Sequence, residues 1–246
     1  MFNLGVAVSI AKKPLYSWEY TIDFCTTNRL SLIQFYWQYP LPLIKRSEAL
    51  RLQNRYLHLP GNLKMIESLP DFSLAYRGFN KYYESNKLII HQQGDGGSVH
   101  DDSLIRQLNT LNCLVGFENH HSESLNGYTS SLYAWHQKQY RIFVVFDVHK
   151  FFNRFYRKYS VKEILQAIRR LFLCCRELNL TLLLHIIDSK SFQANEAQWC
   201  PVFEGIVPYE EIFDILLNKP VNCEGLILEY QDEIMALESI NRLHRD

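Results

Sequence analysis

Short apolar runs recur along the chain at roughly regular intervals, with polar or amphipathic stretches between them. Each run is continuous rather than alternating, which is typical of strands buried on both faces of a parallel sheet. The runs are Leu4–Ile10, Leu30–Tyr36, Tyr56–Leu59, Lys87–His91, Cys113–Phe117, Arg141–Phe146, Leu180–Ile187 and Gly225–Leu228. The hydrophobic pattern therefore predicts a set of buried, parallel strands.

The stretches between the runs indicate helices. Apolar residues recur at helical spacing over Val161–Leu178, Tyr209–Leu217, Glu233–Leu243 and, more briefly, Ser103–Leu111. The long connection Pro60–Asn86 is expected to hold two helices divided at Pro70, because proline ends a helix. Strands alternating with helices over 246 residues favour a closed (β/α)₈ barrel, with residues 1–246 as one domain. An open, doubly wound sheet is the alternative, but no GxGxxG motif supports its dinucleotide-binding form.

Composition narrows the class of protein. Hydrophobic residues make up 47% of the chain, which is enough for a large core, and the formal net charge of zero gives no electrostatic sign of nucleic-acid binding. The six cysteines show no CxxC spacing, so we expect reduced core thiols. The chain start lacks a signal-peptide pattern, and no run reaches the roughly 18 apolar residues of a membrane span. We therefore expect a cytoplasmic protein without a membrane partner.

Histidines and carboxylates stand at the ends of six consecutive predicted strands. They are His58, His91, Glu118, Asp147, His185 and Glu229. Taken singly, such a histidine suits a structural hydrogen bond, and Asp147 suits the N-cap of the next helix. Together they would converge on the C-terminal mouth of a barrel, where carboxylates repel one another without a counter-charge. Mixed imidazole and carboxylate ligands predict Zn²⁺, or alternatively Mn²⁺ or Fe²⁺.

Short motifs around these residues occur in a characteristic order. They are Leu57-His58-Leu59-Pro60, Ile90-His91-Gln92-Gln93-Gly94, Phe117-Glu118-Asn119, Phe146-Asp147-Val148-His149, His185-Ile186-Ile187-Asp188-Ser189-Lys190-Ser191, Phe203-Glu204-Gly205 and Leu228-Glu229. In this order they resemble the endonuclease IV family of apurinic/apyrimidinic endonucleases, within the xylose-isomerase-like barrel superfamily. The run from His185 to Ser191 is the most specific part, being similar to the family's H-L-N-D-[SA]-K-S.

The resemblance implies a zinc-dependent enzyme that cleaves DNA at abasic sites. By motif, His58, His91 and Glu118 would hold one ion. Glu118, as a bridge, would hold a second together with Asp147, His185 and Glu229. Two close ions would activate a bridging water, with Glu118 and Glu229 as the catalytic carboxylates. The residues expected to bind substrate are Gln34, Tyr36, Trp37, Asn119, Asp188 and Lys190.

The third zinc site of that family is altered here. The family pattern D-x-x-H becomes Asp147-Val148-His149-Lys150, and its D-R-H becomes Ala197-Gln198-Trp199. His149, Lys150 and Cys200 are the residues left that could substitute. We therefore expect two ions rather than three.

Two further functions fit the same residues. A sugar or sugar-phosphate isomerase or epimerase needs one ion, and its usual ligand set looks like Glu118, Asp147, His185 and Glu229. The two glutamates could then act as general acid and base on a sugar carbon. A catalytically silent barrel retained for binding is the remaining alternative. The endonuclease is the main prediction from the sequence.

Overall fold

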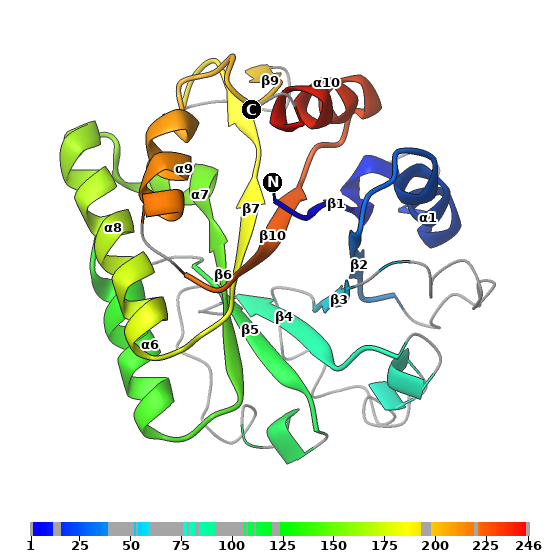
Figure 1. Cartoon of the computed structure of the whole chain (residues 1–246), viewed down its shortest axis with the longest axis horizontal. Coiled ribbons are helices and arrows are strands. Elements are labelled where there is room, and N and C mark those ends of the chain that lie inside the picture. Colours follow the sequence, from blue (N-terminus) through cyan, green and yellow to red (C-terminus); the bar gives the residue numbers. More distant parts are fainter. Residues whose placement is uncertain are drawn as a thin grey trace.

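Eight parallel strands close into a barrel, with helices packed outside it (Figure 1). The computed structural model describes residues 2–11, 16–38, 52, 54–59, 76–77, 79–81, 84–91, 106, 108–110, 112–119, 124–192, 198–218 and 221–244. The barrel strands are β1 (Leu4–Ala7), β2 (Leu32–Tyr36), β3 (Asn54–His58), β4 (Lys87–His91), β5 (Leu114–Glu118), β6 (Ile142–Asp147), β7 (Leu182–Ile186) and β10 (Cys223–Leu228). Strands β1 to β7 neighbour one another in chain order, and β10 closes the ring between β7 and β1.

The predicted barrel is confirmed, and the predicted strands differ from the observed ones mainly at their ends. Strand β4 matches its apolar run residue for residue. The first run is shorter as a strand, because Val8–Ala11 turns into the 3₁₀ helix η1. The helices predicted over 60–86 and 103–111 lie mostly outside the described residues.

The described helices cover the outside of the barrel. They are α1 (Trp18–Thr27), α6 (Gly127–Gln137), α7 (Val148–Phe155), α8 (Val161–Glu177), α9 (Tyr209–Asn218) and α10 (Glu233–Leu243). Helix α8 begins with a capping box, in which Ser160 and Glu163 satisfy each other's backbone amides. No helix among the described residues is long and apolar enough to span a membrane.

The apolar residues form two layers. A large cluster lies between the strands and the outer helices. A smaller one fills the barrel interior and includes Leu32, Tyr56, Phe143 and Leu183. All six cysteines are free thiols, and five are buried. The interior below the mouth is therefore packed with side chains, which leaves the C-terminal end of the barrel for chemistry.

A short hairpin follows β7 and was not expected from the sequence. Strand β8 (Asp188–Ser189) pairs antiparallel with β9 (Trp199–Cys200). The Asp188 carboxylate accepts hydrogen bonds from the backbone amides of Ser189, Gly205 and Val207. These bonds fix the hairpin to the chain that precedes α9.

Gly116 leaves room in the barrel interior for a large neighbour. It faces Phe143 across the β5–β6 register, and a Cβ at Gly116 would lie 2.3 Å from the Phe143 ring. We predict that Gly116→Ala destabilises the protein by about 1–3 kcal/mol, because the ring cannot move within a filled interior. Urea unfolding of both proteins measures the difference.

The matched control is Gly127→Ala. A Cβ there would meet only the Ser124 hydroxyl, at 3.2 Å. Alanine is also the better helix former, so this variant should be neutral or slightly stabilising. Equal stability of the Gly116 variant and the parent protein would contradict the packing argument.

Candidate functional site

The barrel brings the six strand-end residues to one place. His58, His91, Glu118 and Asp147 are the last residues of their strands, His185 is the penultimate residue of β7, and Glu229 directly follows β10. The parallel register sets His91 beside Glu118 and Asp147 beside His185. Their convergence follows from strand closure, because the carboxyl ends of all eight strands meet at the mouth.

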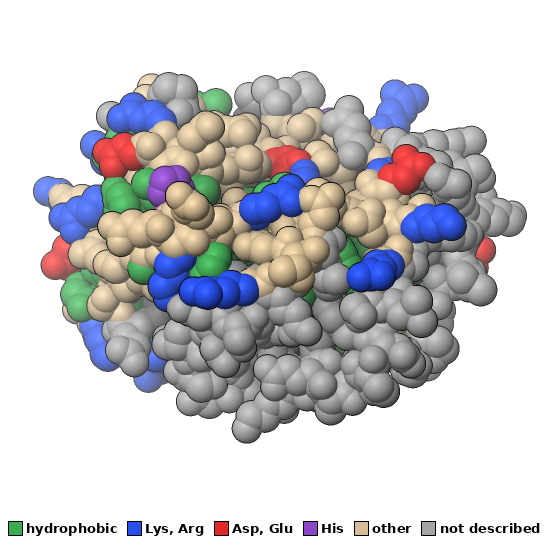
Figure 2. Space-filling view, turned by 90° about the horizontal axis from the view of Figure 1, so that it is seen from below, with side chains coloured by type: hydrophobic (Ala, Val, Ile, Leu, Met, Phe, Trp, Pro, Cys, Tyr) green, Lys and Arg blue, Asp and Glu red, His purple; other side chains and the backbone are tan. Residues whose placement is uncertain are grey.

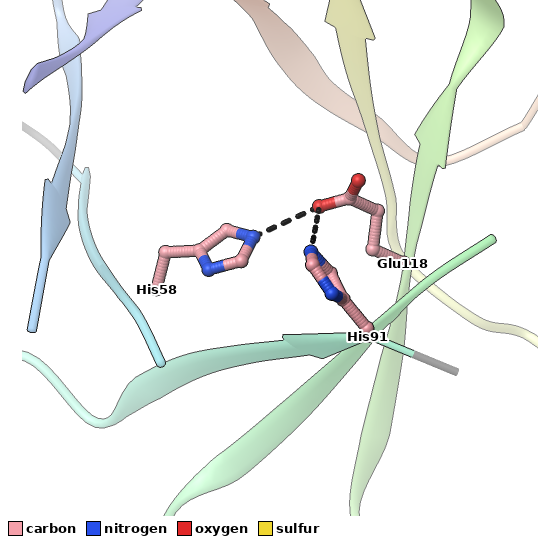
Figure 3. A group of neighbouring side chains, drawn as sticks. All are labelled: His58, His91 and Glu118. Carbon is pink, nitrogen blue, oxygen red and sulfur yellow. Dashed lines mark hydrogen bonds and ion pairs between the residues drawn. The ribbon is translucent and has the colours of Figure 1, made fainter. Parts of the chain in front are cut away.

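Glu118 lies at the centre of this group and has no exposed surface. One of its oxygens, Oε2, is 2.9 Å from His58 Nε2, 3.9 Å from His91 Nε2 and 3.5 Å from His185 Nδ1. Figure 3 shows the imidazoles of His58 and His91 turned toward this one oxygen. A single carboxylate oxygen therefore faces imidazole nitrogens from three strands.

The other oxygen of Glu118 contacts the ammonium group of Lys150. Lys150 Nζ also lies 2.9 Å from Asp147 Oδ2 and 3.9 Å from Glu229 Oε2. One cation is thus shared by three carboxylates. Burial disfavours the charged form of Lys150, but these carboxylates outweigh it and hold its pKa well above the ordinary value.

The same charges set the ionisation of the neighbouring groups. Burial alone would raise the pKa of Glu118, but the Lys150 ammonium and the nearby imidazoles hold that pKa well below its ordinary value. Burial likewise favours a neutral His185, yet the charges of Glu229 and Glu118 raise its pKa. Glu118 is therefore held in its charged form although its side chain has no exposed surface.

Local structure explains why Lys150 points into this cluster. Asp147 ends β6 and is also the N-cap of α7, where its Oδ1 accepts the Lys150 backbone amide at 2.7 Å. This cap holds the first turn of α7 against the strand end, so that the side chain of Lys150 lies over the carboxylates. The structure thus shows Asp147 as the N-cap of the next helix, while its role as a metal ligand stays a prediction.

Hydrogen bonds outside the cluster orient its members. Gln34 Nε2 donates to Glu229 Oε1 at 3.1 Å, and Asn119 exchanges two hydrogen bonds with the backbone of Asp147. His58 Nδ1 lies 2.7 Å from the Leu59 carbonyl, which can only accept, so Nδ1 carries the proton. Metal-binding histidines are commonly fixed in this way.

The donor set fits a divalent cation. Two groups of residues have ligand atoms within 4.8 Å of one another: His58, His91 and Glu118, and Glu118, Asp147 and His185. Glu229 adjoins the second group, with Oε1 3.2 Å from His185 Nδ1. Among the described residues, neither ring nitrogen of buried His185 makes a hydrogen bond of good geometry. Imidazole and carboxylate ligands of this kind suit Zn²⁺, Mn²⁺ or Fe²⁺, and the shared Glu118 would touch both groups.

A pocket of about 450 Å³ opens above the cluster. His58, His91, Lys150 and Glu229 contribute to its polar lining, whereas Tyr16, Tyr36 and Trp37 contribute aromatic surface. Burial and the nearby charge of Glu229 raise the pKa of Tyr36, so its hydroxyl stays protonated. This volume and this mixture of surfaces suit a small, polar ligand.

The sequence-predicted substrate residues divide into two sets. Tyr36 and Trp37 line the pocket. Gln34 donates a hydrogen bond to Glu229, and Asn119 accepts one from the backbone of Asp147. The Asp188 carboxylate instead accepts hydrogen bonds from three backbone amides. The ammonium group of the exposed Lys190 donates to the backbone carbonyl of Glu204 at 2.6 Å. Both are therefore engaged in the region of the hairpin.

The three residues considered for a third metal site also separate. Lys150 lies in the central cluster. His149 is buried with Nε2 2.9 Å from the Ser189 hydroxyl, and Cys200 is buried in β9. Ala197 of the altered motif lies outside the described residues. These residues do not form a group with metal-ligand spacing in the described part of the chain.

Three residues that line the pocket were not predicted from the sequence: Tyr16, Gln38 and Leu59. Tyr16 lies in the turn between η1 and α1 with a positive φ of 56°, and Gln38 Nε2 donates to its carbonyl at 2.9 Å. Gln38 and Leu59 lie within two residues of the ends of β2 and β3, and Tyr16 follows β1 after the helix η1. Position just after a barrel strand was the available signal, because those loops form the mouth.

Comparisons with known proteins bear on the fold. No protein-family model matches the chain, and no curated protein matches it. The probable 3-DHS dehydratase AsbF from Bacillus anthracis is similar, with a TM-score of 0.64, 15% identity and full coverage of both chains. A sugar phosphate isomerase/epimerase from Parabacteroides distasonis has a TM-score of 0.58 and 12% identity, over 98% of this chain and 93% of that one.

A xylose isomerase-like TIM barrel protein from Mycobacterium smegmatis, in complex with magnesium, has a TM-score of 0.60 and 9% identity. The alignment covers 100% of this chain and 96% of that one. At such identities the likeness shows the fold alone. It confirms the predicted (β/α)₈ barrel, while the resemblance to endonuclease IV and to its superfamily stays a prediction.

Because Glu118 belongs to both ligand groups, its replacement should weaken metal binding throughout the mouth. We predict that metal-stripped protein takes up Zn²⁺ or Mn²⁺, and that Glu118→Gln lowers the affinity at least about tenfold. Equilibrium dialysis followed by elemental analysis measures the bound metal.

Circular dichroism checks that the buried substitution leaves the fold intact, and His58→Asn provides a second, less buried variant. Glu238→Gln, on the exposed surface of α10, is the matched control and should bind metal like the parent protein. The absence of any bound transition metal in the parent protein would contradict the metal-site assignment.

Proposed function

We propose that this chain is a metal-dependent enzyme that moves a proton at a carbon beside a carbonyl group in a small polyhydroxylated substrate. Isomerisation or epimerisation of a sugar or sugar phosphate is the reaction class. The observation that carries the proposal is the juxtaposition of Glu229, Lys150 and two imidazoles in the lining of one 450 Å³ pocket. A base, a fixed cation and metal ligands thus face the same small volume.

Glu229 is the residue we assign as the base. It reaches the pocket, and the hydrogen bond from Gln34 to Oε1 fixes its carboxylate. Removing a proton from the substrate carbon would leave an enediolate, whose negative charge needs a positive partner. The Lys150 ammonium lines the same pocket and is held charged by its carboxylate neighbours.

A divalent ion bound at this mouth would polarise the substrate carbonyl and make the adjacent carbon more acidic. Returning the proton to the neighbouring carbon gives isomerisation, and returning it to the opposite face of the same carbon gives epimerisation. The aromatic side chains of Tyr36 and Trp37 suit the apolar face of a sugar ring. Similar structures described as a sugar phosphate isomerase/epimerase and a probable dehydratase support the proposal through their shared fold.

Glu229→Gln removes the base while preserving the shape of the side chain. We predict that turnover falls by about 10²–10⁴, because general-base catalysis contributes that much. Incubation with a panel of ketoses, aldoses and their phosphates in D₂O tests this directly. Nuclear magnetic resonance detects deuterium entering the carbon beside the carbonyl, even where product does not accumulate.

Glu238→Gln is again the control, since it removes an exposed carboxylate from α10 without approaching the mouth. It should exchange deuterium like the parent protein. Equal exchange by the Glu229 variant and the parent would contradict the assigned base. If the parent exchanges deuterium into none of the sugars, the proposed reaction class fails.

Phosphodiester hydrolysis at abasic DNA remains the second candidate. His58 and His91 favour it, because with Glu118 they form a ligand group beside that of Glu118, Asp147 and His185, and hydrolysis by two ions needs two such groups. The formal net charge of the chain is zero, which gives less support to nucleic-acid binding. Among the described residues of the face in Figure 2, lysine and arginine side chains lie in separate groups between acidic and uncharged ones, without a continuous basic band.

We predict slow or undetectable incision of a duplex that carries one abasic analogue. Loss of one preorganised electrostatic contact commonly lowers the rate by about 10²–10³, and the family's third metal pattern is altered here. The assay uses Zn²⁺ or Mn²⁺ at low salt, so that phosphate contacts are not screened. Rapid, metal-dependent nicking that disappears in Glu118→Gln would instead make the endonuclease the preferred function.

A further inference from the structure

The two candidate ligand groups differ in what already faces their carboxylates. Glu118 Oε2 faces the three imidazole nitrogens, whereas Oε1 contacts the Lys150 ammonium. The first group, His58, His91 and Glu118, therefore has an oxygen available beside two pocket-facing histidines. The second group, Glu118, Asp147, His185 and Glu229, has its carboxylates gathered around a cation that belongs to the chain.

The ammonium group and a metal ion would compete for the second group. Lys150 Nζ is 2.9 Å from Asp147 Oδ2, and a metal–oxygen bond is about 2.0–2.2 Å long. An ion bound to that oxygen would thus lie within about 5 Å of Nζ, since the two distances add to that limit at most. Two cations at this separation repel strongly in a buried site. They would also draw on the same oxygens.

The backbone keeps Lys150 in this position. Its amide is fixed by the Asp147 cap, so the side chain starts directly above the strand ends. The side chain is nevertheless 40% exposed, which gives the ammonium group a path to solvent. Lys150 is therefore placed to occupy the carboxylate cluster and is able to leave it.

We propose that Lys150 is the resident cation of the second group, so that the chain binds one divalent ion, at His58, His91 and Glu118. A second ion enters Glu118, Asp147, His185 and Glu229 only when the ammonium group is displaced. While Lys150 is in place, Glu118 bridges an ion and an ammonium group rather than two ions. The inference deepens the proposed function by stating which ligand group its metal occupies.

Lys150→Met tests the inference by removing the charge and keeping the length of the side chain. Metal-stripped proteins are equilibrated with Zn²⁺, and bound zinc is counted by elemental analysis, while competition with a chromophoric chelator gives the affinities. The parent protein should bind one ion per chain. The Lys150→Met variant should bind two, with affinity in the second group raised at least tenfold.

Two controls separate charge from packing and general surface effects. Lys150→Arg keeps a cation and should still bind one ion, whereas Lys162→Met, on the exposed surface of α8, should not change the count. Lys150→Gln is measured beside Lys150→Met, and circular dichroism verifies the fold of each variant. Adding His91→Ala assigns the sites: it should remove the ion from the parent protein but leave one in the Lys150→Met background.

Two tightly bound ions in the parent protein would overturn the inference, as would an unchanged count in both neutral Lys150 variants. Loss of all metal from those variants would also overturn it, because Lys150 would then support binding rather than oppose it. Zinc counts do not depend on turnover. If the zinc counts are as expected but the protein exchanges no deuterium, only the proposed function is refuted. If deuterium is exchanged but the zinc count does not change in the neutral Lys150 variants, only the role of Lys150 is refuted.

Discussion

A buried negative charge at the centre of the barrel mouth constrains everything around it. Glu118 has no exposed surface, so water cannot stabilise its ionised form. Its charge is balanced by Lys150 on one oxygen and by imidazoles on the other. Each of these partners comes from a different strand end or the helix start beside it. The barrel must therefore close in its observed register for Glu118 to remain charged.

The junction between β6 and α7 connects this electrostatic requirement to the backbone. Asp147 ends the strand, caps the helix and pairs with the lysine three residues later. A helix that started one residue later would move Lys150 away from Glu118. The hairpin after β7 is anchored separately, since Tyr209 and Tyr230 bind the backbone of Ile187 and Asp188 through their hydroxyls. The mouth is thus held by hydrogen bonds that leave the pocket-facing groups available.

The fold could be predicted from the sequence because strands buried on both faces leave continuous apolar runs, and β4 shows this with matching ends. Helix α1 could not, because Trp18, Tyr20, Ile22 and Phe24 alternate with polar residues as they would in a strand. Its identity as a helix is apparent only from the Ser17 cap and its packing.

The candidate site could be predicted from the sequence only where barrel closure positions its residues. Residues at strand ends were identified correctly as neighbours, since closure of the barrel alone brings them together. Asp188 and Lys190 were predicted by motif to bind substrate, and in the structure the β8–β9 hairpin directs Asp188 toward backbone amides. Pairing between two-residue strands leaves no periodic signal in the sequence. The central position of Lys150 also depends on a helix cap rather than on its spacing from the other ligands.

The nature of the cation in the mouth bears on which chemistry the site can perform. Hydrolysis by two ions requires both to share a bridging water, whose pKa falls because it is coordinated twice. An ammonium group stabilises nearby negative charge through its hydrogen bonds, but it cannot coordinate water in this way. Proton transfer at carbon needs less: one base, and positive charge close to the oxygen that becomes negative. Under the proposed function, Glu229 and Lys150 would meet that requirement, because both line the same pocket and lie 3.9 Å apart.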